Sequence, residues 1–216
     1  MSAESTTITA AHFAYIAERT RTDDDLLRDL RAAASDAGIP AIQISPEQAS
    51  FLQILLQLAG VREVVEVGTL AGYSAITMAR ALPDGGRVRT IEVSQTHAEF
   101  AREWIARSDV AERIEVLQGR GLDLLPKFGA DSADAIFLDA DKKSYPAYLE
   151  EGLRIVRRGG LIMADNAFAF GQLFDEYPTD GEAQAMKAFN EIMAAEPRVQ
   201  SVIVPLGDGC WIGVKR

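Results

Sequence analysis

The feature that most constrains the fold is an alternation along the chain. From Val61 onward, short apolar runs rich in β-branched residues alternate with helical patterns. This alternation predicts a parallel sheet with helices on both faces. We expect helices to begin near Gly72, Thr96, Gly121 and Tyr145, and a turn at Arg158-Gly159-Gly160 to start the last of the parallel strands. The five expected strands are residues 63–67, 87–93, 113–117, 135–138 and 161–164.

The C-terminal part of the chain breaks this alternation. After a helix expected at 182–194, two apolar runs at 199–204 and 210–214 are separated only by a short loop that contains Gly207-Asp208-Gly209. Such a loop is too short for a crossover connection and predicts an antiparallel hairpin. The expected fold class is therefore α/β, with a mostly parallel seven-stranded sheet that ends in this hairpin.

The N-terminal region has helical rather than strand character. Helices are expected at 23–37 and 47–58, the second opened by Ser45 as N-cap and Pro46 at the first helical position. A chain of 216 residues without a linker rich in Pro, Gly or Ser suits one domain. We expect a single domain over 1–216, with a helical cap at 1–60 on a core at 61–216.

Charge and cysteine content exclude several classes of partner. A net charge of −10 argues against binding to nucleic acid or to an anionic membrane surface, so a small molecule is the expected partner. No stretch is long and apolar enough for a membrane span, and residues 1–7 lack the pattern of an export signal. Cys210 is the only cysteine, which excludes an intramolecular disulfide and fits a cytoplasmic location.

A glycine turn follows the first strand and suggests a cofactor site. Gly68 and Gly72 lie four residues apart, whereas a dinucleotide fingerprint needs three glycines in the pattern Gly-x-Gly-x-x-Gly. The acidic Glu66 before the turn would repel a pyrophosphate and attract a cationic sulfonium or ammonium group. Glu92 ends the second strand, where a carboxylate can bind both hydroxyls of a ribose. Alternatively, the two glycines form only a packing turn and Glu92 caps a helix.

Three oxygen-bearing side chains follow two strands of the predicted sheet. Asp139 follows one strand, and Asp165 and Asn166 follow another, at the carboxyl ends where open α/β sheets bind ligands. Two carboxylates and an amide suit Mg²⁺ best, with Mn²⁺ or Ca²⁺ as alternatives. An octahedral Mg²⁺ would retain about three open positions, which suggests a substrate with two neighbouring hydroxyl groups.

Lys142, three residues beyond Asp139, is the candidate general base. A sulfonium methyl group is already electrophilic, so the protein must chiefly provide an anionic oxygen in line with it. A divalent cation would lower the pKa of a phenol and Lys142 would accept its proton. The competing interpretation is structural, since Asp139 and Asp141 could cap a helix and Asp165-Asn166 could form a turn.

The residues together resemble the cation-dependent O-methyltransferases of the caffeoyl-CoA and catechol type. The resemblance rests on Phe137-Leu138-Asp139-Ala140-Asp141-Lys142 with Tyr145, on Asp165-Asn166 and on the turn from Glu66 to Ser74, and it extends from about Ile42 to the C-terminus. It implies a Rossmann-like methyltransferase fold, S-adenosylmethionine as cofactor, a metal site at Asp139, Asp165 and Asn166, catalysis by Lys142 with Asp139, and a homodimer. The implied cofactor-binding residues are Ile44, Glu66, Gly68, Thr69, Ser74, Glu92, Gly121, Asp139 and Asp141.

The sequence departs from many relatives directly after Asp165-Asn166. Phe168 and Phe170 stand where relatives carry an aromatic residue and a glycine-containing loop that shapes the acceptor pocket. These rings are candidates to contact an aromatic substrate, or to pack within a lid. Methylation of one hydroxyl of a catechol-like molecule is the expected reaction. The alternatives are a nicotinamide-dependent oxidoreductase and a non-catalytic methyltransferase-like binding module.

Overall fold

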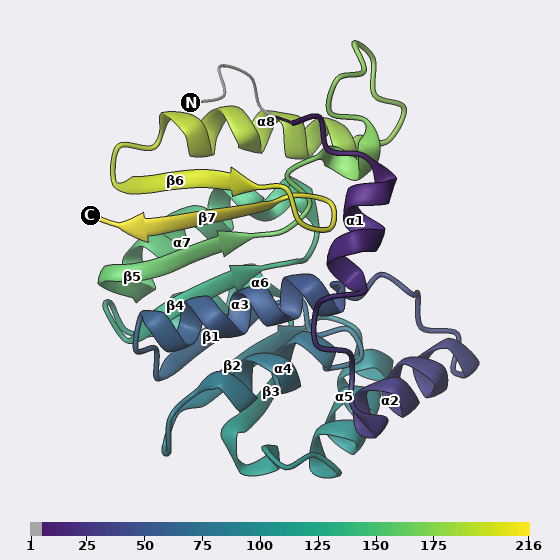
Figure 1. The fold of residues 1–216 in the computed structure, drawn as a ribbon. Coiled ribbons are helices and arrows are strands. Elements are labelled where there is room, and N and C mark those ends of the chain that lie inside the picture. Colours follow the sequence, from purple (N-terminus) through teal and green to yellow (C-terminus); the bar gives the residue numbers. More distant parts are fainter. Residues whose placement is uncertain (1–5) are drawn as a thin grey trace.

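A seven-stranded sheet forms the centre of the protein in a computed structural model that describes residues 6–216. The strand order is β3-β2-β1-β4-β5-β7-β6, and Figure 1 shows the last two strands as the C-terminal hairpin. Neighbouring strands are parallel from β3 to β5, whereas β7 runs antiparallel to both β5 and β6. The predicted fold class is confirmed. The strands are β1 (Glu63–Val67), β2 (Arg87–Glu92), β3 (Ile114–Gln118), β4 (Ala133–Leu138), β5 (Val156–Ala164), β6 (Val199–Val204) and β7 (Cys210–Lys215).

Helices cover both faces of the sheet and enclose two apolar clusters. Successive residues of a strand point to opposite faces, so Val64 belongs to one cluster and Val65 to the other. Helices α2 to α5 contribute to the first cluster, and α7 and α8 contribute to the second. The helices are α1 (Ala10–Ala17), α2 (Asp25–Asp36), α3 (Pro46–Leu58), α4 (Tyr73–Ala81), α5 (Gln95–Ala106), α6 (Gly121–Leu124), α7 (Tyr145–Ile155) and α8 (Gly181–Ala195).

The N-terminal cap contains the two predicted helices and one that was not predicted. Ser45 is the N-cap of α3 and Pro46 is its first residue. The side chains of Ser45 and Gln48 each accept a hydrogen bond from the other residue's backbone amide, which forms a capping box. Helix α1 is short, with eight residues, and none of them is buried. Residues 1–5, which include most of the segment used to predict the lack of an export signal, lie outside the described residues. None of the described helices is long and apolar enough to cross a membrane.

Strand β5 begins five residues earlier than the sequence predicts. The expected turn at Arg158-Gly159-Gly160 lies inside the strand, beside a shift in register between Ala133 and Ala135 of β4. Gly159 has a φ of +78°, and a Cβ on Gly160 would lie 2.5 Å from the carbonyl oxygen of Asp134. These glycines therefore accommodate a bulge rather than a chain reversal.

The strand order reverses between β1 and β4. Strands β2 and β3 lie on one side of β1, and β4 and β5 lie on the other. The register pairs Val67 with Ile91 on one side and with Leu138 on the other, and Leu138 pairs with Ala164. The residues that follow these strands therefore meet at a single edge. In open α/β sheets this edge, at the strand-order reversal, is where ligands bind.

Candidate active site

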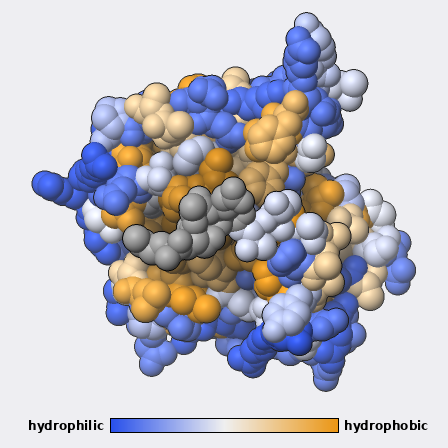
Figure 2. All heavy atoms as spheres, turned by 45° about the horizontal axis from the view of Figure 1, so that its top comes forward, coloured by the Kyte–Doolittle hydropathy of each residue, from blue (hydrophilic) through white to orange (hydrophobic). Residues whose placement is uncertain are grey.

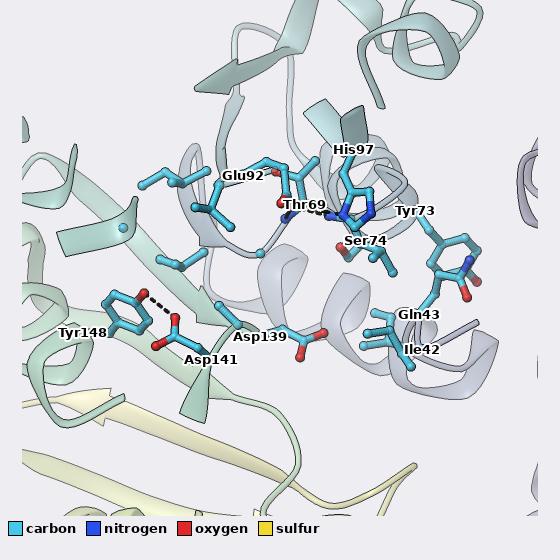
Figure 3. Close-up of a pocket in the computed structure, with 18 of the residues that line it drawn as sticks. Ile42, Gln43, Thr69, Tyr73, Ser74, Glu92, His97, Asp139, Asp141 and Tyr148 are labelled. Atoms are coloured by element: carbon cyan, nitrogen blue, oxygen red, sulfur yellow. Dashed lines mark hydrogen bonds and ion pairs between the residues drawn. The ribbon is translucent and has the colours of Figure 1, made fainter. Parts of the chain in front are cut away.

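A cavity of about 210 Å³ opens at the carboxyl edge of β1, β2 and β4, and the segment from Ile42 to Ile44 also lines it. Figure 3 shows Asp139 and Asp141 facing it from one side and Glu92 from the other. Glu66 is the one predicted cofactor residue that does not line it. The other eight do: Ile44, Gly68, Thr69, Ser74, Glu92, Gly121, Asp139 and Asp141.

The glycine turn requires its glycines for both conformation and space. Gly68 and Gly72 have φ values of +105° and +91°, a region that side chains rarely allow. A Cβ on Gly68 would collide with the backbone carbonyl of Asp139. The turn after β1 is therefore in direct backbone contact with the residue that follows β4.

Glu92 binds the glycine turn from the end of β2. Its Oε2 accepts hydrogen bonds from the amides of Thr69 at 3.2 Å and Leu70 at 2.8 Å, and its Oε1 accepts one from the amide of Ser94 at 2.9 Å. Nδ1 of His97 lies 3.8 Å from Oε1 of Glu92. Oε1 of Glu92 can accept a further hydrogen bond from a ligand in the cavity, because each carboxylate oxygen has two lone pairs and only one of those on Oε1 is used.

Glu66 lies beneath the turn rather than in the cavity. Its side chain is fully buried, and its two oxygens have no hydrogen-bond partner among residues 6–216. Burial raises the pKa of Glu66 to about 8, and the nearby Ser74 and Thr90 hydroxyls only partly oppose this shift. With a pKa of about 8, Glu66 is protonated in the ligand-free chain at neutral pH, and a cationic ligand in the cavity would favour its ionised form.

The three predicted metal ligands come together at the ends of β4 and β5. The amide of Asp165 donates to the carbonyl of Leu138 at 3.0 Å, which places Asp165 beside Asp139. Burial, followed by the negative charge of Asp139, raises the pKa of Asp165 to about 7. Asn166 has a φ of +67°, a conformation that Asn tolerates better than most residues.

These residues have the chemistry that a hard cation needs. The Lys142 ammonium group offsets part of the repulsion between Asp139 and the buried Asp165, and a divalent ion would offset more of it. Within residues 6–216, no group of three or more Asp, Glu, His or Cys side chains could hold a metal. An ion here would therefore need the amide oxygen of Asn166 as its third protein ligand, as the sequence predicts.

Lys142 is buried next to these carboxylates. Its Nζ lies 3.2 Å from Oδ1 of Asp139 and 2.6 Å from the hydroxyl oxygen of Tyr145. The Tyr145 hydroxyl in turn donates to the carbonyl of Leu138 at 2.9 Å, and the backbone amide of Lys142 donates to Oε2 of Glu182 in α8 at 2.7 Å. These contacts fix the ammonium group at the end of β4.

The two phenylalanines predicted near the substrate have different surroundings. The ring of Phe170 lies 6.0 Å from Nζ of Lys142, and 43% of the residue is exposed. Phe168 packs against the hairpin, where a Cβ on Gly209 would lie 2.9 Å from its ring. Phe170 is therefore the better placed of the two to contact an acceptor bound near Lys142.

Several residues at the site were not predicted because their partners are distant in the sequence. The hydroxyl of Tyr148 donates to Oδ1 of Asp141 at 2.7 Å, and the hydroxyl of Tyr73 donates to Oδ1 of Asp23 at 2.6 Å. Gln48 donates to Asp165. Of these residues, only Tyr148 could have been inferred from its sequence neighbours, since it lies one helical turn after Tyr145 and on the same face of α7.

Comparison with known proteins identifies the family. A family model described as O-methyltransferase matches residues 17–216. The chain belongs to this family. It is 39% identical to a catechol O-methyltransferase of Niastella koreensis, over 93% of this chain and 90% of that protein. It is 36% identical to a catechol O-methyltransferase of Mycobacterium tuberculosis, over 88% of this chain and 87% of that protein.

Solved structures of O-methyltransferases have the same fold. The structure of the O-methyltransferase from Bacillus cereus in complex with SAH has a TM-score of 0.87 and 37% identity, covering 95% of this chain and 97% of that one. An O-methyltransferase from Streptomyces achromogenes in complex with SAM has a TM-score of 0.85 and 30% identity, over 95% and 96% of the two chains. Membership of the O-methyltransferase family confirms the resemblance and decides against the nicotinamide-dependent oxidoreductase.

Proposed function

We propose that this O-methyltransferase transfers a methyl group from S-adenosylmethionine to one hydroxyl of a vicinal dihydroxy aromatic molecule, with the help of a divalent cation. The observation that carries the proposal is that Lys142, Asp139, Asp165 and Asn166 follow neighbouring strands at the sheet edge where the cavity opens. The two relatives named catechol O-methyltransferase support the choice of substrate class.

The cavity residues can divide the binding of the methyl donor between them. Glu92 at the end of β2 is placed to accept bonds from ribose hydroxyls, as carboxylates at this position do in related sheets. The backbone of Gly68, the hydroxyl of Ser74 and the carboxylate of Asp139 are further candidates to contact the donor, because these residues also line the cavity. The relatives solved with SAH and SAM support S-adenosylmethionine as the methyl donor.

The residues at the strand ends can then remove the proton of the acceptor. Asp139, Asp165 and Asn166 would hold the cation, which when bound supplies positive charge that attracts both hydroxyl oxygens and lowers the pKa of the reacting one. In its neutral amine form, Lys142 takes the hydroxyl proton on Nζ while the oxygen forms a bond to the methyl carbon and the carbon–sulfur bond breaks. The products are a methyl ether, S-adenosylhomocysteine and a protonated lysine.

A methyl-transfer assay tests this function directly. Labelled S-adenosylmethionine is incubated with a panel of catechols and with matched monophenols, in the presence of EDTA and after restoration of Mg²⁺, Mn²⁺ or Ca²⁺. We expect transfer to catechols only, abolished by EDTA and by Asp165→Ala. Transfer that continues in EDTA would reject the role of the metal, and binding of S-adenosylhomocysteine without transfer to any acceptor would favour the binding module.

The proposal extends to assembly and location. The face in Figure 2 carries hydrophobic residues toward its middle and mainly hydrophilic residues at its rim. Exposed apolar side chains include Tyr15 of α1 and Leu58 of α3, which are 59% and 81% exposed. We therefore retain the homodimer, and sedimentation velocity would reveal a monomer if this is wrong.

A cytoplasmic location accords with the single cysteine, Cys210, which is buried as a free thiol.

A further inference from the structure

The orientation of the Asn166 amide is set by a residue of the β6–β7 loop. Oδ2 of Asp208 accepts a hydrogen bond from Nδ2 of Asn166 at 3.3 Å and another from the backbone amide of Phe170 at 2.8 Å. An ionised carboxylate can only accept hydrogen bonds, so Asn166 must present its amide nitrogen to Asp208. The amide oxygen of Asn166, which is the atom able to bind a cation, is thereby kept free.

The orientation of the Asp165 carboxylate is set by a residue of α3. Nε2 of the buried Gln48 donates to Oδ1 of Asp165 at 2.6 Å. The amide of Gln48 cannot be reversed without loss, because its Oε1 accepts a hydrogen bond from the backbone amide of Ser45 at 3.3 Å. The hydrogen bond from Gln48 therefore fixes how the Asp165 carboxylate is turned and uses one lone pair of Oδ1, so other lone pairs of the carboxylate remain for a ligand.

The two orienting residues are also packed together. Gly207 precedes Asp208 in the β6–β7 loop, and a Cβ on Gly207 would collide with the side-chain amide of Gln48. The start of α3 and the β6–β7 loop are therefore in contact with each other. Both reach the proposed ligands, although those ligands follow β4 and β5.

We propose that Gln48 and Asp208 are positioning residues for the cation site. Gln48 fixes the orientation of the Asp165 carboxylate, and Asp208 selects the oxygen rather than the nitrogen of the Asn166 amide for the ion. This inference rests on the proposed function, because it requires that the three ligands bind a cation. Partners that orient metal ligands in this way commonly contribute about 10- to 100-fold to metal affinity.

Binding of Mn²⁺ to the full chain tests the role of Asp208. The free Mn²⁺ signal is followed by electron paramagnetic resonance, without methyl donor or acceptor. We expect Asp208→Asn to weaken Mn²⁺ binding by about 10-fold or more, because an amide at this position no longer dictates which atom Asn166 presents. Glu47→Gln removes one negative charge at the neighbouring start of α3 without touching a ligand, and should leave the affinity unchanged.

A second pair of variants tests Gln48. Gln48→Leu and Ser45→Ala each break the capping box of α3, but only the first removes the hydrogen bond to Asp165. Both should therefore lower the melting temperature by a similar amount, while only Gln48→Leu should weaken Mn²⁺ binding about 10-fold or more. Binding of S-adenosylhomocysteine, measured by calorimetry, verifies that each variant is folded.

The outcomes separate this inference from the proposed function. If the wild-type chain does not bind Mn²⁺, the proposed metal site itself is wrong. If the wild type binds Mn²⁺ and both Asp208→Asn and Gln48→Leu bind it equally well, the positioning role is overturned while the metal site stands. Should one variant fail to bind S-adenosylhomocysteine, the other decides the question alone.

Discussion

Glu66 shows how a single side chain can couple stability to pH. Below its ordinary pKa of 4.5 the carboxyl is protonated in both the folded and the unfolded chain. Between that value and about 8, the folded chain retains the proton that the unfolded chain has lost. The folded state then binds more protons, so the free energy of unfolding decreases as pH rises through this window. Asp165, with its pKa raised to about 7, acts in the same direction.

We expect the melting temperature of the ligand-free protein in EDTA to fall between about pH 5 and pH 8. Glu66→Gln cannot titrate and should show a smaller fall, with a difference on the order of a few kcal/mol in the free energy of unfolding across this range. Thermal unfolding of both proteins in a pH series measures it. Parallel curves for wild type and variant would show that Glu66 is not the group responsible.

Lys142 offers a test of proton transfer that is separate from binding. Lys142→Met removes the proton acceptor and should lower kcat by about 10²- to 10⁴-fold, with little change in the affinity for S-adenosylhomocysteine. Lys143→Met alters the adjacent, exposed lysine and should retain activity. Steady-state kinetics with a catechol distinguishes the two, and a loss of less than tenfold in the first variant would exclude Lys142 as the base.

At the scale of elements, α2 holds the segment that closes the cofactor cavity. Nη2 of Arg31 donates to the carbonyl of Ile44 at 2.9 Å, and Nε of Arg31 donates to Oδ2 of Asp23 at 2.8 Å. Asp23 also accepts the hydroxyl of Tyr73, and the Arg31 guanidinium lies 4.1 Å from the centre of the Tyr73 ring. Ile44 and Tyr73 both line the cavity, so α2 supports two of its walls.

Removal of this support should weaken cofactor binding. Each hydrogen bond contributes roughly 0.5–1.5 kcal/mol, so Arg31→Ala should weaken binding of S-adenosylhomocysteine by about three- to tenfold or more. Arg158→Ala removes an exposed arginine from β5 and should bind normally. Isothermal titration calorimetry on the two variants gives the comparison. Equal affinities would mean that Ile44 keeps its place without α2.

The sequence predicts the strands well but not the hydrogen bonds between distant elements. β1, β2 and β4, which hold or precede Glu66, Glu92 and Asp139, were predicted to within two residues at each end, because β-branched and other apolar residues in each are followed by turn residues. The hydrogen bond between Gln48 and Asp165 joins residues 117 positions apart, and that between Asp23 and Tyr73 joins residues 50 apart. Nothing local marks such pairs, since they arise only when α2 and α3 pack on the sheet.

At the scale of the whole molecule, each face of the sheet contains one buried tryptophan. Trp104 of α5 belongs to the cluster that α2 and α3 complete, and Trp211 of β7 belongs to the other. If residues 1–216 form one domain, both clusters should unfold together. The single-tryptophan variants Trp104→Phe and Trp211→Phe should show one fluorescence transition each at the same urea concentration as circular dichroism. Separate midpoints would divide the chain into two cooperative units.

The backbone contact between Gly68 and Asp139 has a consequence for how enzymes of this design can diversify. Gly68 lines the proposed methyl-donor cavity, and Asp139 begins the segment proposed to bind the acceptor. Their backbones touch with no side chain between them, so substitutions cannot easily change the distance between donor and acceptor. Residues such as Phe170, farther out on the loop after Asn166, carry no such restriction. New acceptors should therefore evolve through changes in that outer loop, while the transfer distance itself is inherited unchanged.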